Sequence, residues 1–308
     1  MTLQQLEYII AVDKLRNFTK AADYCRVTQP TLSAMIQKLE EELGVKIFDR
    51  NQQPICPTVI GNIVIKQAHE VLLQANHIKE IIAEEKSSLG GSFKLGILPT
   101  IAPYLLPRFV PLLAKKYPHL DIRMAEMKTS EIKAALLSGD IDAGILADLD
   151  GLSDYSKESL FYEQFYAYVS KESALSGNNV VRTSDLANEQ LWLLDEGHCF
   201  RDQMVKFCQL KSAKASQIAY NLGSMETFMR MVESCKGVTF IPELAVLQLS
   251  ESQRQLAHEF AIPKPTRHII MLTNKNYIRQ QLISAIAHEI KQSVPKSMLS
   301  LRANQVSI

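Results

Sequence analysis

Apolar residues recur at helical spacing through the first sixty positions of the chain. Residues 3–15 form an amphipathic helical pattern, and a second, shorter helix is expected over 19–25. Thr28 is expected to cap a third helix, with Pro30 in its first turn and Gly44 at its end. Two short helices that meet across a tight turn predict a helix-turn-helix. The predicted buried stripe of the third helix is Leu32, Met35, Ile36, Leu39 and Leu43.

A longer apolar repeat follows between Gly61 and Lys86. Its spacing of 4-3-4-3-4 residues predicts a coiled-coil seam about 30 Å long. We favour this seam over a helix that packs on its own domain, because the other faces carry many charges. Residues 87–92 predict a flexible hinge and the main domain boundary. The seam positions are Val64, Ala68, Val71, Ala75, Ile78 and Ile82.

From Phe93 onward, strand-like and helix-like patterns alternate, which predicts a multidomain α/β protein with parallel sheets covered by helices. Ligands in such sheets bind beyond the carboxyl ends of the strands. Thr100 and Thr129 occupy such positions, although helix capping would also explain them. Strands are expected at 93–97, 121–127, 142–147, 165–170, 191–195, 238–242 and 268–272, and helices around 103–117, 130–138 and 277–292.

Composition narrows the class of protein. The net charge is +1, with 22% charged and 46% hydrophobic residues, as in ordinary globular chains of more than one domain. We find neither an apolar run of about 18 residues nor a signal peptide, so we expect a cytoplasmic protein without a membrane partner. Five scattered cysteines without zinc-type spacing predict no metal and no cofactor. In the cytosol, a disulfide would be transient and regulatory.

Reactive chemistry concentrates in residues 197–208. Cys199 lies between His198 and Arg201, and neighbouring positive charge lowers a thiol pKa towards neutrality. An oxidised Cys199 could condense with Cys208 on the same segment. The apolar spacing after Cys199 predicts a helix, which would separate the two cysteines by roughly 13 Å along its axis. A disulfide needs Cα atoms within about 7 Å, so oxidation would have to unwind this helix. Two unrelated cysteines remain the alternative.

The helix-turn-helix resembles that of LysR-type transcriptional regulators. The resemblance rests on Ala21-Ala22, residues 28–33, Leu39-Glu40, Phe48 and Thr58-x-x-Gly61. Residues 1–58 carry seven basic and seven acidic side chains, so a single domain should bind DNA weakly and several linked domains are needed. Polar side chains of the third helix suit base edges and phosphates. The DNA-binding candidates are Gln29, Pro30, Thr31, Ser33, Gln37 and Arg50.

The cysteine segment is similar to that of the peroxide-sensing OxyR branch of this family, as are residues 224–227 and 237–245. The resemblance implies a winged helix-turn-helix domain (1–60), a linker and dimerisation helix (61–87) and a sensor domain (88–308). The sensor is expected to resemble periplasmic binding proteins, with lobe I over 92–162 and 267–300 and lobe II over 163–266.

The resemblance also implies roles for individual residues. Cys199 would be the thiolate that hydrogen peroxide oxidises and Cys208 the resolving thiol, with His198 and Arg201 favouring the thiolate. Thr100, Thr129 and Asp202 would hydrogen-bond the peroxide, and Arg267 is expected to approach the same site. Cys25, Cys56 and Cys235 would take no part.

The implied partners are promoter DNA, RNA polymerase, further copies of the chain (a homodimer assembling to a homotetramer) and a thioredoxin- or glutaredoxin-type reductant. Oxidation would switch activation or repression, and the protein would not be an enzyme. Two alternatives stay open. One is a LysR-type regulator whose cleft binds a small organic anion, with Arg201 as carboxylate clamp. The other is a thiol peroxidase that turns peroxide over.

Overall fold

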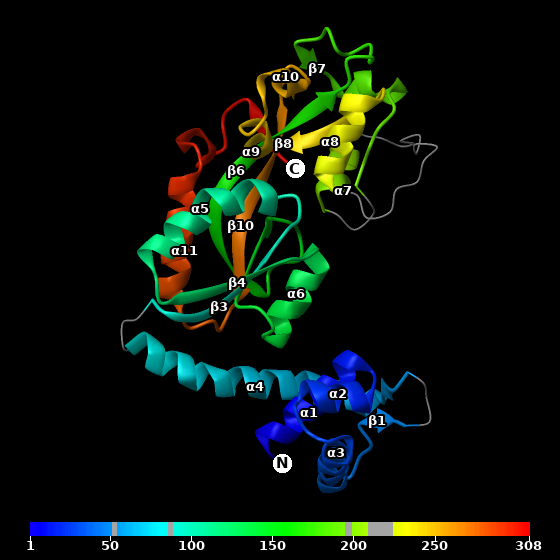
Figure 1. Cartoon of the computed structure of the whole chain (residues 1–308), viewed down its shortest axis with the longest axis vertical. Coiled ribbons are helices and arrows are strands. Elements are labelled where there is room, and N and C mark those ends of the chain that lie inside the picture. The colour runs from blue at the N-terminus through cyan, green and yellow to red at the C-terminus, as the bar shows by residue number, and fades with distance from the viewer. Residues whose placement is uncertain (51–53, 86–88, 195–198, 209–223) are drawn as a thin grey trace. The chain divides into compact units, whose positions relative to one another are not determined.

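A computed structural model describes residues 1–50, 54–85, 89–194, 199–208 and 224–308. The chain divides into two compact units, coloured from blue to red along the sequence in Figure 1. Unit 1 consists mainly of Met1–Ser88, and unit 2 of Leu89–Leu136 with Asp140–Ile308. Among the described helices, none is long and apolar enough to cross a membrane.

Unit 1 is the predicted helix-turn-helix. The Thr28 hydroxyl accepts the Thr31 N–H at 3.4 Å and caps the third helix, which ends at Gly44 with φ +67°. The hairpin that follows pairs Phe48 with Pro57, while residues 51–53 of the predicted wing lie outside the described residues. Its elements are α1 (Leu3–Leu15), α2 (Phe18–Tyr24), α3 (Gln29–Leu43), β1 (Phe48–Asp49), β2 (Cys56–Pro57) and α4 (Val59–Glu85).

The apolar stripe of α3 packs into the core of unit 1. Leu32, Ile36 and Leu39 are fully buried and Met35 is half-buried, as predicted. Leu43 was wrongly placed in this stripe, because it lies in the last turn of α3 and is 39% exposed.

The long helix predicted after the hairpin is confirmed as α4, but the packing preferred for its first half is wrong. Ala68 is buried in the core of unit 1, and Val64 and Val71 pack against the same core. These three seam positions of α4 therefore pack against the core of unit 1. The side chains of the later seam positions Ile78 and Ile82 lie outside the described residues.

Unit 2 is built around a mixed sheet. Its strand order is β4-β3-β5-β10-β6-β9-β7, with β11 also pairing with β10 and β8 with β6. The strands are β3 (Gly91–Ile97), β4 (Leu120–Glu126), β5 (Ala143–Ala147), β6 (Tyr155–Val169), β7 (Val180–Val181), β8 (Val238–Pro242), β9 (Ala257–Phe260), β10 (Lys264–Asn274) and β11 (Gln305–Ser307).

The prediction of parallel sheets is only partly right. Strand β3 is parallel to β4 and β5, but β10 runs antiparallel to both β5 and β6. The long strands β6 and β10 connect the two lobes: the second half of β6 pairs with β8 and β9. Strand β6 leads the chain from lobe I into lobe II and β10 leads it back, so the two strands run in opposite directions. The local alternation of strand and helix patterns does not reveal such a return.

Helices cover the sheet, with α5 and α11 packed together in lobe I (Figure 1). In unit 2 the helices are α5 (Ala102–Lys116), α6 (Thr129–Ser138), α7 (Cys199–Phe207), α8 (Met225–Ser234), α9 (Glu243–Val246), α10 (Glu251–Arg254) and α11 (Gln280–Ser293), and the 3₁₀ helices are η1 (Thr183–Asn188) and η2 (Lys296–Met298).

Two local predictions need correction. Gly91 and Ser92, predicted to be part of a flexible hinge, begin strand β3, and Arg279 donates to the Ser92 carbonyl at 3.0 Å. Residues 86–88 of that hinge lie outside the described residues. Of the strand predicted over 191–195, residues 191–194 form only a single bridge, between Leu191 and Val238, and residue 195 lies outside the described residues.

Candidate functional site

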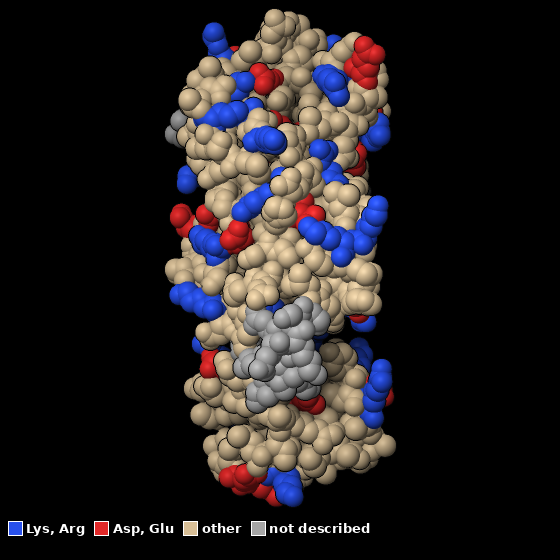
Figure 2. Space-filling model, turned by 90° about the vertical axis from the view of Figure 1, so that its left-hand side faces the viewer, with Lys and Arg blue, Asp and Glu red and all other residues tan. Residues whose placement is uncertain are grey.

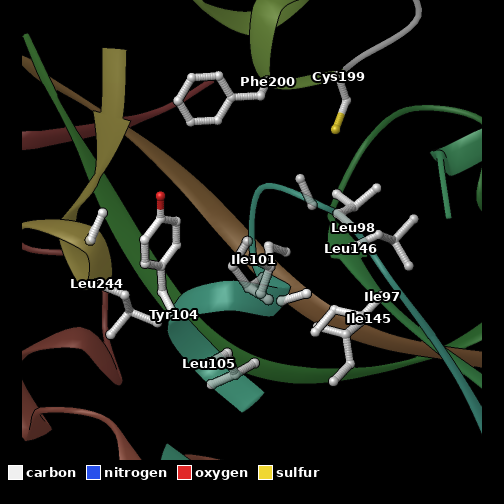
Figure 3. Close-up of a cluster of buried hydrophobic side chains, with 14 of the residues drawn as sticks. Ile97, Leu98, Ile101, Tyr104, Leu105, Ile145, Leu146, Cys199, Phe200 and Leu244 are labelled. Carbon is white, nitrogen blue, oxygen red and sulfur yellow. The ribbon is translucent and has the colours of Figure 1, made fainter. Parts of the chain in front are cut away.

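Cys199 is the first residue of α7, and the helix predicted after it is confirmed. Phe200, Met204 and Cys208 are buried on one face, which fixes the helix against lobe II. Cys199 itself is 9% exposed. In Figure 3 its sulfur points toward the loop after β3, where Leu98 lies.

A small pocket surrounds this thiol. Its walls come from two segments of lobe I and from the start of α7 in lobe II. Ile97 and Glu126 are register partners at the ends of the parallel strands β3 and β4, so the residues after both strands meet at one edge. The pocket therefore brings Thr100 and Thr129 together with Cys199, as predicted. It is lined by Leu98, Pro99, Thr100, Lys128, Thr129, Cys199 and Phe200.

Arg267 lies directly behind this pocket and is fully buried. Its Nη1 donates to the Thr100 hydroxyl and its Nη2 to the Thr100 carbonyl, both at 3.0 Å. Its guanidinium carbon lies 5.2 Å from the centroid of the Phe200 ring. A cation is thus held against two residues that line the pocket.

The pKa of Cys199 is raised from its ordinary value, chiefly because burial disfavours the thiolate. Arg267, the Thr129 hydroxyl and the Phe200 N–H each lower it, and Asp202 raises it. The sequence predicted a lowered pKa, and this net direction is wrong because the burial of Cys199 outweighs the nearby positive groups. The positive charge that lowers the thiol pKa comes from Arg267, almost seventy positions away along the chain.

The Thr129 hydroxyl is a buried polar atom in need of a partner. No conventional hydrogen bond to it occurs among the described residues, although it faces the Cys199 thiol closely enough to lower its pKa. A small polar molecule in the pocket would satisfy this hydroxyl.

Arg201 and Asp202 follow Cys199 in the first turn of α7. Their closest charged atoms are 3.6 Å apart, and the Asp202 side chain is 59% exposed. Neither residue lines the pocket described above, which argues against Arg201 as a clamp for a carboxylate inside it. His198 lies outside the described residues.

Cys208 is buried just beyond α7, and its N–H donates to the Met204 carbonyl at 2.9 Å. Burial raises the pKa of the Cys208 thiol to about 12. Both cysteines are free thiols, and the helix between them keeps them roughly 13 Å apart along its axis. Cys25 and Cys56 are half-buried and Cys235 is exposed. The described residues contain no group of three His, Cys, Asp or Glu that could hold a metal ion.

The DNA-binding candidates lie around the start of α3. Gln29, Pro30, Thr31 and Gln37 are exposed, whereas Ser33 is half-buried. Arg50 donates to the Ser33 hydroxyl at 3.2 Å, so this cation is tied to α3 from the hairpin side. Figure 2 shows that basic and acidic side chains are interspersed on the face in view, with uncharged residues covering most of it.

Glu40 has a structural role in unit 1 that the sequence did not predict; it was noted only among the residues of the helix-turn-helix resemblance. Its buried carboxylate accepts the Ile47 N–H at 2.8 Å and lies 3.6 Å from Arg50. This one acidic side chain connects α3 to β1 and to the Arg50 cation. An acidic residue four positions after the buried Ile36 and directly after the buried Leu39 was the available signal.

Comparisons with known proteins agree with this arrangement. Residues 3–62 match the helix-turn-helix of bacterial regulatory proteins of the lysR family, and residues 86–295 match the LysR substrate binding domain. The hydrogen peroxide-inducible genes activator of Pectobacterium carotovorum subsp. carotovorum is 34% identical over 272 residues, covering 88% of this chain and 90% of that protein.

Two solved structures are also similar. OxyR from Porphyromonas gingivalis is 44% identical with a TM-score of 0.66, covering 70% of this chain and 99% of that one. A full-length OxyR variant from Pseudomonas aeruginosa is 32% identical with a TM-score of 0.75, covering 94% of this chain and 98% of that one.

The fold and the site define a class of protein in which a helix-turn-helix unit is joined to a two-lobed α/β sensor. The chain belongs to the LysR family of bacterial transcriptional regulators and, within it, to the OxyR group. Members of this family regulate transcription and are not enzymes.

Proposed function

We propose that this chain is a DNA-binding transcriptional regulator that senses hydrogen peroxide through Cys199 and a reversible Cys199–Cys208 disulfide. The observation that carries the proposal is the pocket around Cys199. It places a thiol at a helix N-terminus, beside the unsatisfied Thr129 hydroxyl and in front of the buried Arg267. The lining residues pack closely around the thiol, so peroxide would have to move them aside to enter.

The proposed oxidation of Cys199 and Cys208 has two steps. The Cys199 thiolate attacks one peroxide oxygen, an S–O bond forms, the O–O bond breaks, and the leaving hydroxide takes up a proton to become water. The Cys208 thiol then attacks the sulfenic sulfur, and a disulfide and a second water form. Sulfur is oxidised and peroxide is reduced. Thr100, Thr129 and Asp202 would hydrogen-bond the peroxide and help to move a proton to the leaving hydroxide, while His198 and Arg201 would favour the thiolate and polarise the peroxide.

The second step requires α7 to unwind. A disulfide needs Cα atoms within about 7 Å, and the helix keeps the two cysteines farther apart. Because Phe200 and Met204 of α7 lie in the core of the sensor, its unwinding would repack lobe II. Such a change between two packings is what a redox switch needs to act on distant DNA-binding units.

The assembly and its partners form the finer part of the proposal. Domains over 1–60, 61–87 and 88–308 would act as DNA reader, dimerisation helix and sensor, with two dimers joining as a tetramer on promoter DNA. The readers would present Gln29, Pro30, Thr31, Ser33, Gln37 and Arg50 to the DNA. Oxidation would change contacts with RNA polymerase, a thioredoxin- or glutaredoxin-type reductant would reset the thiols, and both steps would occur in the cytoplasm.

A DNA footprint tests this proposal. Promoter fragments selected by the reduced protein are compared with and without equimolar peroxide for the wild type, Cys199→Ser and Cys235→Ser. We expect the wild type and Cys235→Ser to change footprint reversibly, and Cys199→Ser to stay unchanged. An unchanged wild-type footprint, or an equal response of Cys199→Ser, would contradict it. Response to an organic anion alone would then support the effector-binding alternative, and continuous peroxide consumption the peroxidase.

A further inference from the structure

A buried acidic residue, Glu163, lies next to Arg267, and the proposed oxidation steps do not use it. Glu163 and Arg267 are register partners on the antiparallel strands β6 and β10, so their side chains project from the same face of the sheet. Glu163 is 1% exposed and Arg267 is 0% exposed. The pair lies where the two paired strands pass from one lobe to the other.

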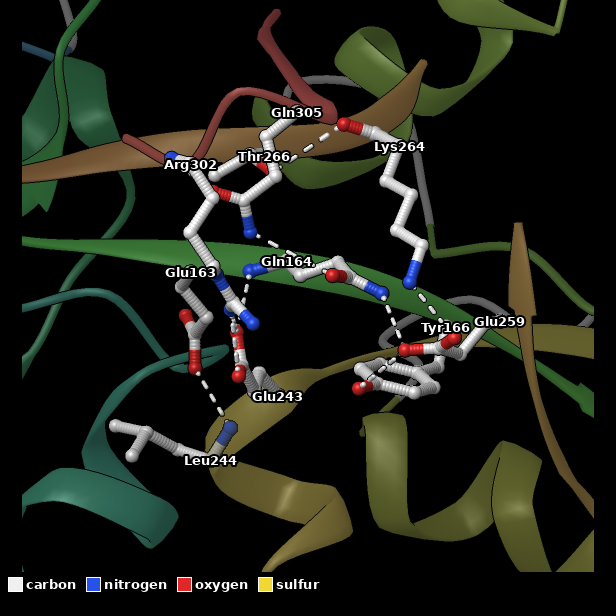
Figure 4. A network of polar contacts seen from close by, with 10 residues as sticks. All are labelled: Glu163, Gln164, Tyr166, Glu243, Leu244, Glu259, Lys264, Thr266, Arg302 and Gln305. Atoms are coloured by element: carbon white, nitrogen blue, oxygen red, sulfur yellow. Dashed lines mark hydrogen bonds and ion pairs between the residues drawn. The ribbon is translucent and has the colours of Figure 1, made fainter. Parts of the chain in front are cut away.

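The hydrogen bonds identify Glu163 as an ionised carboxylate. Its Oε2 accepts from Arg267 Nε at 2.9 Å and from Nη2 at 2.7 Å. Its Oε1 accepts the Leu244 N–H at 3.1 Å, a contact drawn in Figure 4. Every partner is a donor, which suits the charged form and leaves the protonated form without an acceptor for its hydrogen. Burial raises the pKa of Glu163, and the charge of Arg267 opposes that rise.

Arg267 therefore contacts the pocket residue Thr100 on one side and Glu163 on the other. Toward the pocket it donates to both oxygens of Thr100 and faces the Phe200 ring, and it favours the Cys199 thiolate. Away from the pocket, the carboxylate of Glu163 attracts the same cation. Arg267 acts directly on the thiol, and the carboxylate paired with it makes its effect weaker than that of a free guanidinium.

We propose that Glu163 is a positioning residue that aims Arg267 at Thr100 and Phe200 and offsets its charge, and so limits the rate at which Cys199 reacts with peroxide. The inference rests on the proposed peroxide-sensing function. A sensor whose thiol is restrained in this way responds only when peroxide is abundant. Removal of the negative charge alone would make the sensor react faster.

The decisive variant is Glu163→Gln, which keeps the shape and one acceptor oxygen but removes the charge. Glu243→Gln is the matched control, since the Glu243 carboxylate lies beside Glu163 but pairs with Arg302 at 2.7 Å. The other charged or titratable residues near Cys199 are the same in both variants; they are Asp202, Lys128 and the sequence neighbours His198 and Arg201.

Two readouts are measured on the full reduced chain. The pH profile of iodoacetamide alkylation at Cys199, read by mass spectrometry, reports the thiolate without peroxide. The rate of Cys199 oxidation by peroxide at pH 7 reports the sensing step. We expect Glu163→Gln to move the profile down by about one pH unit. The thiolate fraction then rises about tenfold and its nucleophilicity falls about threefold, so oxidation becomes roughly threefold faster. Glu243→Gln should leave both unchanged.

A profile that is unshifted or moved upward in folded Glu163→Gln, with native Trp192 fluorescence, overturns the inference. Where the single variant does not fold, the neutral pair E163Q/R267Q provides the test. Its profile should lie within about one unit of the wild type, because the two charges offset each other; a rise of two units or more would show that Glu163 offsets nothing. If wild-type Cys199 fails to react selectively with peroxide while the alkylation shifts appear, the proposed function fails and the role of Glu163 stands.

Discussion

Side chains from lobes I and II, and from the strands between them, determine the chemistry of Cys199. Thr100 and Thr129 come from the segments after β3 and β4, and Arg267 comes from β10. Burial raises the pKa of the Cys199 thiol, while Arg267, the Thr129 hydroxyl and the Phe200 N–H lower it. The resting thiol is therefore weakly acidic, and the groups around it can stabilise negative charge on the sulfur when peroxide enters.

The Thr129 hydroxyl gives the first prediction at the residue scale. We expect Thr129→Val to slow the oxidation of Cys199 by at least roughly tenfold, because a hydrogen bond to a charged group contributes about 1.5–3 kcal/mol. Thr129→Ser keeps the hydroxyl and should keep most of the rate. Stopped-flow mixing with peroxide, followed by thiol trapping, measures both. Equal rates for the valine and serine variants would show that the hydroxyl takes no part.

The buried Cys208 thiol predicts a pH-dependent stability. Its pKa is about 12 in the folded state and about 8.5 in an unfolded chain, so the folded state holds its proton more tightly. The free energy of unfolding should then fall as pH rises through the window from 8.5 to 12. The loss from this group at pH 10 is about 2 kcal/mol.

Urea unfolding of the reduced protein at pH 7.5 and 10, followed by the single Trp192, measures this loss. Cys208→Ala should lose about 2 kcal/mol less than the wild type between these pH values. Cys235→Ala, which changes an exposed thiol, should behave as the wild type. The same pH dependence in the wild type and Cys208→Ala would refute the assignment.

At the scale of elements, α7 is the part that must change. Its buried Gln203 donates to the Ile308 carbonyl, and the Ile308 N–H donates to the Thr266 carbonyl, at 2.6 and 3.0 Å. These bonds tie the centre of α7 to the segment after β11 and so to β10. Unwinding of α7 must break the first of them.

We therefore expect Gln203→Ala to speed disulfide formation without changing the first oxidation of Cys199. Lys206→Ala is the matched control, since Lys206 lies on the exposed face of the same helix. Quenched-flow alkylation separates the sulfenic acid from the disulfide in time. If both variants close the disulfide at the wild-type rate, the contact with Ile308 does not restrain α7.

The elements also show what sequence patterns reveal and what they miss. Capping residues and local periodicity were enough for α3, α4 and α7, since Thr28, Gly44 and the apolar stripe after Cys199 act within a few residues of themselves. The order and direction of strands depend on pairings between β6 and β10, about a hundred residues apart, which no local pattern contains. The same distance hid the ion pair of Glu163 with Arg267, and the burial of Cys199, which sets the direction of its pKa shift, depends on the same long-range packing.

At the scale of the whole molecule, weak DNA contacts must be combined. Residues 1–58 carry no net charge, so phosphate neutralisation by one unit is small. Val64, Ala68 and Val71 of the α4 seam pack within unit 1. We therefore expect strong binding to need several linked copies of the chain on one DNA.

This predicts a steep dependence of binding on DNA length. DNA selected by the full chain should lose at least roughly a hundredfold in affinity when it is shortened to a single half-site, because effective concentration contributes that much. Fluorescence anisotropy at one salt concentration measures both lengths. Affinities within a few-fold of each other would contradict the requirement for linked units.

The most direct test of the central claim is a map of the thiols after oxidation. The reduced protein is treated with a slight excess of hydrogen peroxide, its thiols are differentially alkylated, and the peptides are analysed by mass spectrometry. We predict rapid formation of a Cys199–Cys208 disulfide while Cys25, Cys56 and Cys235 stay free. A Cys199 that stays reduced, or that oxidises no faster than the other three thiols, would contradict the peroxide-sensing account.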